Sequence, residues 1–591
     1  MTELFEPLGE HDARLALTAV GTLADLNRAG VLEAADVHVA ERVGDLGGES
    51  DSTALLALAL AVRAVRSGSV CIDLTTIAAL APEQIWPGPD VWVAAVAASP
   101  LVAAGVLRLE GTLVYLDRYH RLETQVCDDL LTRVATAQRP VDTTALAAAL
   151  ERVRGAHLSA EQEAAVVAAA GRSTTVLTGG PGTGKTTTVA RILVLLADQA
   201  AARGERFSVA LAAPTGKAAT RLQEAVLAEL ADLDPRDRDL VGRPESMTMH
   251  RLLGWRADNS TRFRHDRTNR LKYDLVVVDE CSMVELTMMG RLLEAVRPEA
   301  RLVLVGDPRQ LTSVGAGAVL ADVVRGFEGH ADSPVCSLTE NFRSTRDILS
   351  LAEALRRGDA DEVIAVLRRE SDEVEFVETD DPAEALRADI TGAAIAVRAA
   401  ATAGDPVAAL AQLDEHRLLC AHREGPYGVR HWNRQAERWL GEETGVPVYG
   451  EWYVGRPLLV TSNDYTLEVY NGETGVAVQQ PDGRLRAWVS GSQQLRDYAP
   501  SRLDAVETMH AMTIHKSQGS QAARVTVLLP DADSRLLTRE LFYTAITRAQ
   551  RHVRVVGTEA SVRAAVQREA QRATGLRERL QGASRRNGVA T

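Results

Sequence analysis

The chain has 591 residues, of which 46% are hydrophobic and 25% charged, and its formal net charge is −14. This length predicts about three or four domains, and the composition excludes a disordered or fibrous protein. The negative charge excludes a uniformly basic nucleic-acid coat, but it is compatible with a locally basic channel.

The five cysteines stand singly, without C-x-x-C pairs. This usage predicts a reducing compartment and neither structural zinc nor an iron–sulfur cluster. The first residues lack the basic and then apolar pattern of a secretion signal, and no uninterrupted apolar run is long enough to span a bilayer. We therefore expect a cytoplasmic protein without a membrane partner.

Residues 1–115 carry no catalytic signature. Residues 54–65 (ALLALALAVRAV) predict a buried helix and residues 68–74 a turn into a short strand, whereas Trp86 and Trp92 are expected in a loop interrupted by Pro and Gly. The pattern predicts a small, mostly helical domain. The residues alone favour an inert cap over a docking module for another subunit.

A predicted strand, a glycine-rich loop and a predicted helix follow at residues 174–198. The loop fits G-x-x-x-x-G-K-[ST], in which glycines let the backbone approach nucleotide phosphates. Lys185 would reach the β- and γ-phosphates, and the Thr186 hydroxyl would contact Mg²⁺. The sequence thus predicts a site for ATP and Mg²⁺ formed by Gly179, Gly180, Pro181, Gly182, Thr183, Gly184, Lys185, Thr186 and Thr187.

Upstream of this loop, Ser159 and Gln162 have the spacing of a capping box, in which Gln162 closes a helix end. The alternative function of Gln162 is adenine recognition, because an amide can accept from N6 and donate to N7 of the base. Its position just before a phosphate loop favours adenine recognition.

Alternating strands and helices indicate a parallel sheet, whose ligands gather at the carboxyl ends of the strands. The apolar run 275–278 ends in Asp279 and Glu280. Asp279 would join Thr186 at Mg²⁺, and Glu280 would orient and deprotonate the attacking water. After the predicted strand 208–212, Thr215 and Lys217 suit a phosphate of a second ligand, although solvated loop residues are an equal alternative.

Two later stretches offer groups for the γ-phosphate. Gln310 follows the predicted strand 302–305 and could hydrogen-bond the γ-phosphate or its water. Arg343, within ENFRS, offers a cation, and a surface salt bridge is its alternative role.

The second half predicts another α/β lobe. Helices are expected over 358–411, and strands at 417–420, 525–529 and 553–556. A β-rich insertion at 445–500 contains Asn-Gly and Asp-Gly turn signals. A nucleotide between two lobes would receive Arg343 and Arg548 from the second one. An arginine delivered in this way is worth roughly 10³–10⁵ in rate in phosphoryl transfer.

The stretches GGPGTGKT, APTGKAA, TMHRLLG, LVVVDE, GDPRQL, ENFRS, TIHKSQG and YTAITRA, in this order, resemble superfamily 1 helicases. WYVGRPLLVTSNDYTLEVYNGETG and GLRERL resemble one family among them, the RecD alpha subunits of the RecBCD exonuclease V complex. The implied fold is α/β, with two RecA-like P-loop NTPase lobes, a small helical N-terminal domain and an SH3-like β-barrel insertion in the second lobe. The implied domains are 1–115 (partner docking), 116–333 (lobe 1A, with a possible hairpin at 255–272), 334–444 with 501–591 (lobe 2A), and 445–500 (insertion 2B).

The resemblance implies an ATP-dependent 5′→3′ single-stranded DNA translocase and helicase. It would act with RecB and RecC as a heterotrimer on duplex ends in double-strand-break repair, and residues 1–115 would dock on RecC. Matching motif positions imply an ATP site that includes Gln162, Lys185, Thr186, Asp279, Glu280, Gln310, Arg343 and Arg548. They imply a DNA track of Thr215, Lys217, His250, Thr513 and His515.

We expect no nuclease site in this chain, because no convincing carboxylate cluster is present. Two alternative functions stay open at this point. One is a stand-alone RecD-type repair helicase without RecB and RecC. The other is an assembly or regulatory subunit with an idle ATP site, which the intact Lys185, Glu280, Arg343 and Arg548 disfavour.

Overall fold

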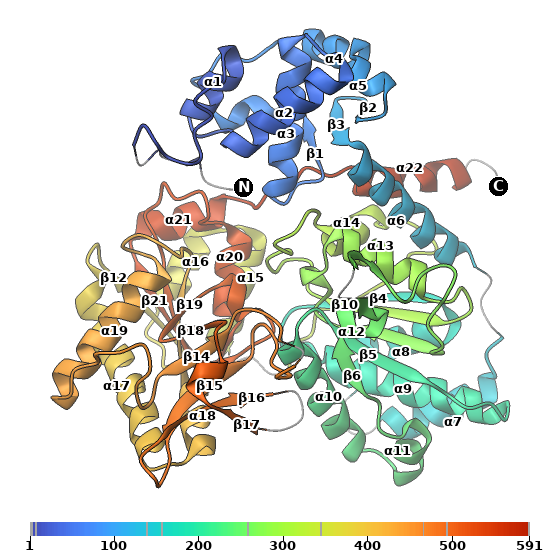
Figure 1. The fold of residues 1–591 in the computed structure, drawn as a ribbon. Helices are drawn as coiled ribbons and strands as arrows, with labels where there is room; N and C mark the ends of the chain where they lie inside the picture. Colours follow the sequence, from blue (N-terminus) through green and yellow to red (C-terminus); the bar gives the residue numbers. More distant parts are fainter. Residues whose placement is uncertain are drawn as a thin grey trace.

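The computed structural model describes residues 4–5, 7, 9–136, 140–154, 158–256, 259–342, 346–464, 466–491 and 495–588. Figure 1 shows an N-terminal part (blue) above two α/β lobes that lie side by side, one green and one yellow to red. None of the described helices contains a stretch that is both long and apolar enough to cross a membrane.

The N-terminal part packs helices around a three-stranded antiparallel sheet with the strand order β1-β3-β2. The predicted helix 54–65 is confirmed within α3, but the loop predicted around Trp92 is wrong. Trp92 lies in α4, is fully buried, and donates its indole N–H to the carbonyl of Thr53 at 3.0 Å. The elements are α1 (Gly21–Arg28), α2 (Ala34–Gly47), α3 (Ser52–Arg66), β1 (Cys71–Asp73), α4 (Pro89–Ala98), α5 (Pro100–Ala103), β2 (Leu107–Glu110) and β3 (Leu113–Leu116).

The first lobe contains a six-stranded sheet with the order β11-β4-β10-β9-β5-β6, in which every pair is parallel. Its strands are β4 (Thr174–Gly179), β5 (Val209–Ala213), β6 (Ser246–Thr248), β9 (Leu275–Val278), β10 (Arg301–Gly306) and β11 (Val335–Leu338). Strand β11 pairs with β4, although the predicted boundary assigns residues from 334 to the second lobe. The first sheet therefore extends past that boundary.

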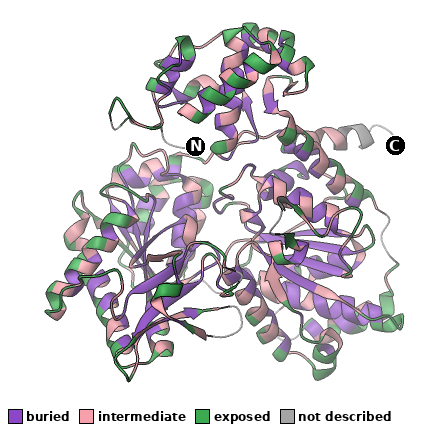
Figure 2. Cartoon of the chain, in the orientation of Figure 1, coloured by how far each residue is buried: buried purple, intermediate pink, exposed green. Residues whose placement is uncertain are grey.

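Helices cover both faces of this sheet, as a fully apolar parallel strand requires. Along β9, Val276 and Val278 contact one apolar core, and Leu275 and Val277 contact the other. Figure 2 shows the strands as a buried layer between partly exposed helices. The helices are α6 (Asp117–Ala135), α7 (Thr143–Arg154), α8 (Ala160–Gly171), α9 (Lys185–Ala202), α10 (Gly216–Ala231), α11 (Pro235–Val241), α12 (Met249–Leu253), α13 (Leu286–Ala295) and α14 (Val319–Gly326).

The second lobe contains a five-stranded parallel sheet with the order β12-β21-β20-β13-β19. Its strands are β12 (Val374–Glu378), β13 (His416–Cys420), β19 (Ala511–Thr513), β20 (Ala522–Leu528) and β21 (Ala549–Gly557). The edge strand β12 lies in a region for which only helices were predicted. Its helices are α15 (Arg346–Arg357), α16 (Ala360–Leu367), α17 (Pro382–Thr402), α18 (Pro406–Glu415), α19 (Val429–Thr444), α20 (Arg539–Ile546) and α21 (Glu559–Gln567).

A five-stranded antiparallel sheet is inserted in this lobe, with the order β17-β16-β15-β14-β18. Its strands are β14 (Pro457–Val460), β15 (Thr474–Gln479), β16 (Leu485–Ser490), β17 (Leu495–Tyr498) and β18 (Val506–Thr508), so the sheet passes the predicted limit at residue 500. Figure 1 shows it beside the first lobe. In the first lobe, β7 (Trp255–Arg256) and β8 (Asn259–Phe263) pair antiparallel within the stretch predicted as a hairpin or loop.

The C-terminal segment returns from the second lobe to the first lobe and the N-terminal part. Leu576 and Leu580 are buried in the first-lobe core, and α22 (Leu576–Gly588) lies beside α14 and α6 (Figure 1). The Val70 amide donates to the carbonyl of Ala573 at 2.8 Å. This segment therefore connects the second lobe, the first lobe and the N-terminal part.

Candidate functional site

The glycine-rich loop joins β4 to the N-terminus of α9, and its backbone conformation requires glycine at two positions. Gly182 and Gly184 have φ values of 81° and 76°, which disfavour other residues. A Cβ atom on Gly184 would lie 2.2 Å from the amide nitrogen of Gln162. A side chain at this position would therefore clash with Gln162, so the cradle formed by this loop requires glycine here.

Inside this cradle, the Lys185 ammonium lies 2.7 Å from the carbonyl oxygen of Gly179 and 2.8 Å from that of Gly180. A cation held by loop carbonyls can exchange them for phosphate oxygens, which are stronger acceptors because they are charged. Thr186 follows as the second residue of α9 and is half-buried. This arrangement fits a triphosphate at a helix N-terminus.

Gln162 forms both of the contacts that a capping role requires. Its side-chain oxygen accepts from the Ser159 amide at 3.0 Å, and the Ser159 hydroxyl accepts from the Gln162 amide at 3.3 Å. The side-chain nitrogen of Gln162 donates to the carbonyl of Thr183 at 3.3 Å. The capping box therefore exists, and it fixes the glutamine against the phosphate loop.

The predicted acid pair lies at the carboxyl end of β9, two strands from β4 in the sheet. The Glu280 amide donates to the Asp279 carboxylate at 2.8 Å, and Glu280 has an unusual φ of 52°. Burial raises the pKa of Asp279, and the negative charge of Glu280 raises it further, while Lys185 opposes both. A cation near Asp279 would favour the ionised form of its carboxylate, which would then be a suitable ligand for Mg²⁺.

Several hydrogen bonds join the two lobes next to this site. Arg548, which follows α20 in the second lobe, donates to the Gln310 side-chain oxygen of the first lobe at 2.9 Å. The Leu311 amide donates to the Thr544 hydroxyl at 2.8 Å, and the Gln518 side chain donates to the Leu311 carbonyl at 2.7 Å. Gln310 and Arg548 are 4% and 5% exposed, so this contact is shielded from water.

Asp307 and Tyr543 form another contact across the lobes, which sequence reasoning missed. The Tyr543 hydroxyl donates to the Asp307 carboxylate at 2.9 Å, and the Gln310 side chain donates to the same carboxylate oxygen at 3.4 Å. Burial raises the pKa of Tyr543 well above its usual value, so the phenol remains a donor. Asp307 lies in the stretch GDPRQL and Tyr543 in YTAITRA, and these two motifs were the signal in the sequence that could have identified both residues.

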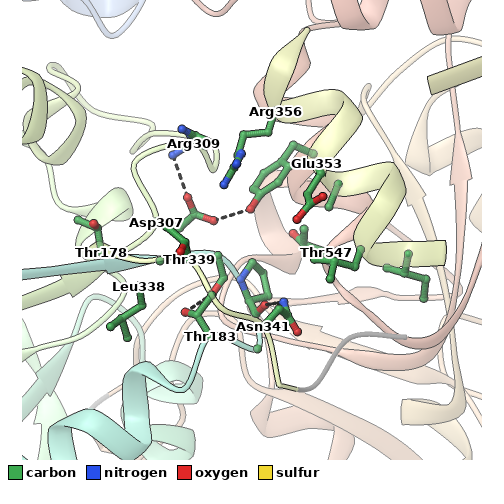
Figure 3. Close-up of a pocket in the computed structure, with 18 of the residues that line it drawn as sticks. Thr178, Thr183, Asp307, Arg309, Leu338, Thr339, Asn341, Glu353, Arg356 and Thr547 are labelled. Atoms are coloured by element: carbon green, nitrogen blue, oxygen red, sulfur yellow. Dashed lines mark hydrogen bonds between the residues drawn. The ribbon is translucent and has the colours of Figure 1, made fainter. Parts of the chain in front are cut away.

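A cavity of about 190 Å³ lies between the phosphate loop and the second lobe. Figure 3 shows Thr183 and Asp307 on one side of it and Glu353 and Thr547 on the other. Asn341 closes it further by donating to the Pro181 carbonyl at 2.6 Å. Arg343, the other predicted arginine, lies outside the described residues.

Four of the five predicted DNA-track residues line one cavity of about 570 Å³ between the lobes and the insertion: Thr215, Lys217, His250 and His515. The fifth, Thr513, is not brought to its wall. Thr513 is buried, and its hydroxyl accepts from the Lys516 amide at 3.3 Å, because the side chain turns toward its own loop. We refer to this space as the track cavity.

Within the track cavity, Lys217 donates to the Thr474 hydroxyl of the insertion at 3.4 Å. Burial lowers the pKa of Lys217 to about 7, and the positive charge of Arg417 acts in the same direction. Burial also lowers the pKa values of His250 and His515, so both rings are neutral near pH 7. Lys217 is therefore a cationic group whose charge changes near neutral pH.

Three regions of the chain match described protein families. Residues 28–115 match the RecBCD enzyme subunit RecD N-terminal domain, residues 162–316 an AAA domain, and residues 508–556 the UvrD-like helicase C-terminal domain. The RecBCD enzyme subunit RecD of Mycolicibacterium smegmatis is 58% identical over 557 residues, which are 94% of this chain and 98% of that protein. The chain belongs to the RecD family.

Two further relatives match this RecD-family chain to different extents. The RecBCD enzyme subunit RecD of Mycobacterium tuberculosis is 56% identical over 575 residues, covering 96% of this chain and 98% of that protein. The ATP-dependent RecD2 DNA helicase of Deinococcus radiodurans is 33% identical over 489 residues. The match covers 82% of this chain but only 60% of the Deinococcus protein. The two mycobacterial RecD subunits thus match this chain in extent, and the RecD2 helicase does not.

Proposed function

We propose that this RecD-family chain is an ATP-dependent 5′→3′ single-stranded DNA translocase and helicase, the RecD subunit of a complex with RecB and RecC. The complex would act on duplex DNA ends in double-strand-break repair. The observation that supports the motor role best is the buried Gln310–Arg548 contact, because it connects the nucleotide-binding lobe to the second lobe. The direction of travel and the partners follow from the family.

In the proposed ATP site, Lys185 releases the Gly179 and Gly180 carbonyls and binds the β- and γ-phosphates. Thr186 and Asp279 would hold Mg²⁺, which neutralises phosphate charge when bound. Glu280 orients the attacking water and accepts its proton, and Arg548 stabilises the charge that develops on the γ-phosphate. We assign Arg343 the same stabilising role, and we assign Gln162 to recognition of the adenine base.

The same residues explain how hydrolysis could move DNA. The phosphates contact the first lobe, and Arg548 belongs to the second, so ATP strengthens the connection between the lobes. Gln310 contacts Arg548 directly and Leu311 contacts Gln518 and Thr544, so loss of the γ-phosphate acts on both lobes. If each lobe grips DNA phosphates in turn along the track cavity, each cycle advances the strand.

We assign residues 1–115 to docking on RecC and the inserted antiparallel sheet to an SH3-like module that forms part of the track wall. Lobe 1A comprises the first sheet with β11, and lobe 2A the second sheet. Any exonuclease step of the complex belongs to a partner subunit in this proposal.

The test is ATP hydrolysis and unwinding by the complex reconstituted with this chain, with and without Lys185→Ala. We expect single-stranded DNA to stimulate ATP hydrolysis by the complex. Lys185→Ala should abolish 5′→3′ unwinding and remove the part of the ATP hydrolysis that this chain contributes. Unchanged rate and direction of unwinding with Lys185→Ala would contradict the motor role. Processive unwinding by the purified chain without RecB and RecC would instead indicate a stand-alone helicase.

A further inference from the structure

The chain between β10 and α14 runs from the nucleotide site to the wall of the track cavity. Residues 311–318 contain neither helix nor strand, and we refer to them as the connecting loop. The loop begins directly after Gln310, and three of its residues line the track cavity: Ser313, Val314 and Gly315. Because buried backbone groups need hydrogen-bond partners, a loop without regular structure depends on other segments to hold one conformation.

Arg572, which lies between α21 and α22, supplies such partners at three positions of the connecting loop. Its Nη1 donates to the carbonyls of Gly315 and Gly317 at 2.6 and 3.3 Å, and its Nη2 donates to the carbonyl of Ser313. Burial lowers the pKa of Arg572 to about 10, so the guanidinium is still charged at neutral pH. Hydrogen bonds from a charged donor are stronger than those between neutral groups. One side chain thus fixes the part of the loop that lines the track cavity.

The N-terminal part contacts both the connecting loop and Arg572. The carbonyl of Gly68 accepts from the Gly317 amide at 2.9 Å. A Cβ atom on Gly68 would lie 2.9 Å from the guanidinium carbon of Arg572, so this close approach requires glycine. The Val70 amide donates to the carbonyl of Ala573, the residue after Arg572. Arg572 therefore holds the connecting loop at the point where the N-terminal part meets the first lobe.

The first lobe contacts the centre of the connecting loop closely. A Cβ atom on Gly315 would lie 1.7 Å from a carboxylate oxygen of Glu285, so there is no room for a side chain. The Leu286 amide donates to the carbonyl of Ala316 at 3.0 Å. Glu285 itself lines the track cavity. A shift of the loop would therefore move Gly315 against Glu285 and change the shape of the track wall.

We propose that Arg572 is a positioning residue of the motor, which holds residues 313–315 in the track wall and so determines how strongly DNA stimulates ATP hydrolysis. This inference rests on the proposed function. Arg572 contacts neither nucleotide nor DNA in this proposal. It acts through the connecting loop, whose other end adjoins Gln310 and hence the contact with Arg548 at the nucleotide site. Replacement of residues that link two sites can change their coupling by roughly 2- to 30-fold.

The experiment measures ATP hydrolysis by the complex reconstituted with RecB and RecC, with and without an oligothymidylate. Subtraction of the rates obtained with Lys185→Ala gives the contribution of this chain. We expect Arg572→Ala to lower the ratio of the DNA-stimulated rate to the unstimulated rate by roughly 2- to 30-fold. The KM for ATP should stay at the wild-type value, because the residues of the ATP site are unchanged. Arg572→Lys keeps the charge but loses the second donor nitrogen, so its ratio should lie between those of wild type and Arg572→Ala.

Arg568→Ala is the matched control for a loss of stability alone. Arg568 stands four residues before Arg572 and also donates to three backbone carbonyls, but these belong to the second lobe: Ala532, Ser534 and Leu537. Its replacement should lower the midpoint of thermal unfolding, as Arg572→Ala does, and leave the stimulation ratio unchanged. A positioning role predicts that only the Arg572 variants change this ratio.

The outcomes separate this inference from the proposed function. If DNA produces no stimulation that Lys185→Ala removes, the proposed function fails, and the positioning role fails with it. If wild type is stimulated but Arg572→Ala and Arg572→Lys keep its ratio, only the positioning role is overturned. An equal loss of stimulation in Arg568→Ala would also overturn it, because destabilisation of the C-terminal segment would then explain the effect. If Arg572→Ala does not assemble into the complex, Arg572→Lys provides the same comparison.

Discussion

Arg548 donates a hydrogen bond of 2.9 Å to the side-chain oxygen of Gln310, and the two residues belong to different lobes. The same guanidinium donates to the carbonyl oxygens of Thr544 and Ser520 at 3.2 and 3.5 Å. The group is thus held by its own lobe while it contacts the other. This geometry suits a residue that transmits nucleotide state, because movement of either lobe changes the contact.

Replacement of Arg548 should therefore affect hydrolysis more than ATP binding. We expect Arg548→Ala to lower kcat for DNA-stimulated ATP hydrolysis by roughly 10³-fold or more, with a smaller change in KM. Arg548→Lys should not restore the rate, because an ammonium cannot reproduce the planar donor fork. Steady-state kinetics with Gln310→Ala and the double variant provide the check. Fully additive effects would contradict a shared role of Gln310 and Arg548.

Gln162 should contribute to both helix capping and nucleotide choice. Gln162→Ala removes its side of the capping box, and we expect a loss of about 0.5–2 kcal/mol in stability. Gln162→Glu retains the acceptor for the Ser159 amide but loses the donor, so stability should be retained while the preference for ATP over GTP falls. The kcat/KM ratio for the two nucleotides measures this preference. If both variants kept the preference for ATP over GTP, Gln162 would have only the helix-capping role.

Binding of DNA should depend on pH through Lys217. Its pKa is lowered to about 7, first by burial and then by Arg417, so the ammonium is mostly charged below pH 7 and mostly neutral above it. A phosphate binds the charged form, and affinity for single-stranded DNA should fall as pH rises from 7, by up to about tenfold per pH unit. Lys217→Arg should remove this dependence, because a guanidinium stays charged. Equal pH profiles for the two proteins would refute the assignment.

The C-terminal segment should stabilise the whole chain. Leu580 is fully buried in the first-lobe core, where it lies opposite Gly326 of α14. Leu580→Ala removes buried methyl groups and leaves a cavity, which costs about 2–5 kcal/mol at such sites. Thermal unfolding should show a clearly lower midpoint than for Leu46→Ala, the control at a leucine that is 72% exposed. Equal midpoints would mean that α22 contributes little to stability.

Much of the architecture could be predicted because its signals are local. The loop 179–186 follows a β-branched strand and opens an amphipathic helix, so its structure depends on neighbours in the sequence. Strand β9 is apolar at every position because both faces are covered, and this pattern is readable without coordinates. Edge strands were harder to predict from the sequence. Half-exposed β12 lies among Ala-rich helices, and β11 gains its place only by pairing with β4.

The sequence by itself determined which residues carry the chemistry of ATP and which family the chain resembles, since both depend on residue types at set spacings. Only the tertiary structure decided which of these residues meet. Arg548 and Gln310 are more than two hundred positions apart, and so are Tyr543 and Asp307, which also meet across the two lobes. The structure also shows that the Thr513 hydroxyl, which the motif assigned to DNA, accepts a hydrogen bond from the Lys516 amide of its own loop. The physical reason is that contacts between distant segments depend on how whole sheets and helices pack, and no short pattern encodes that packing.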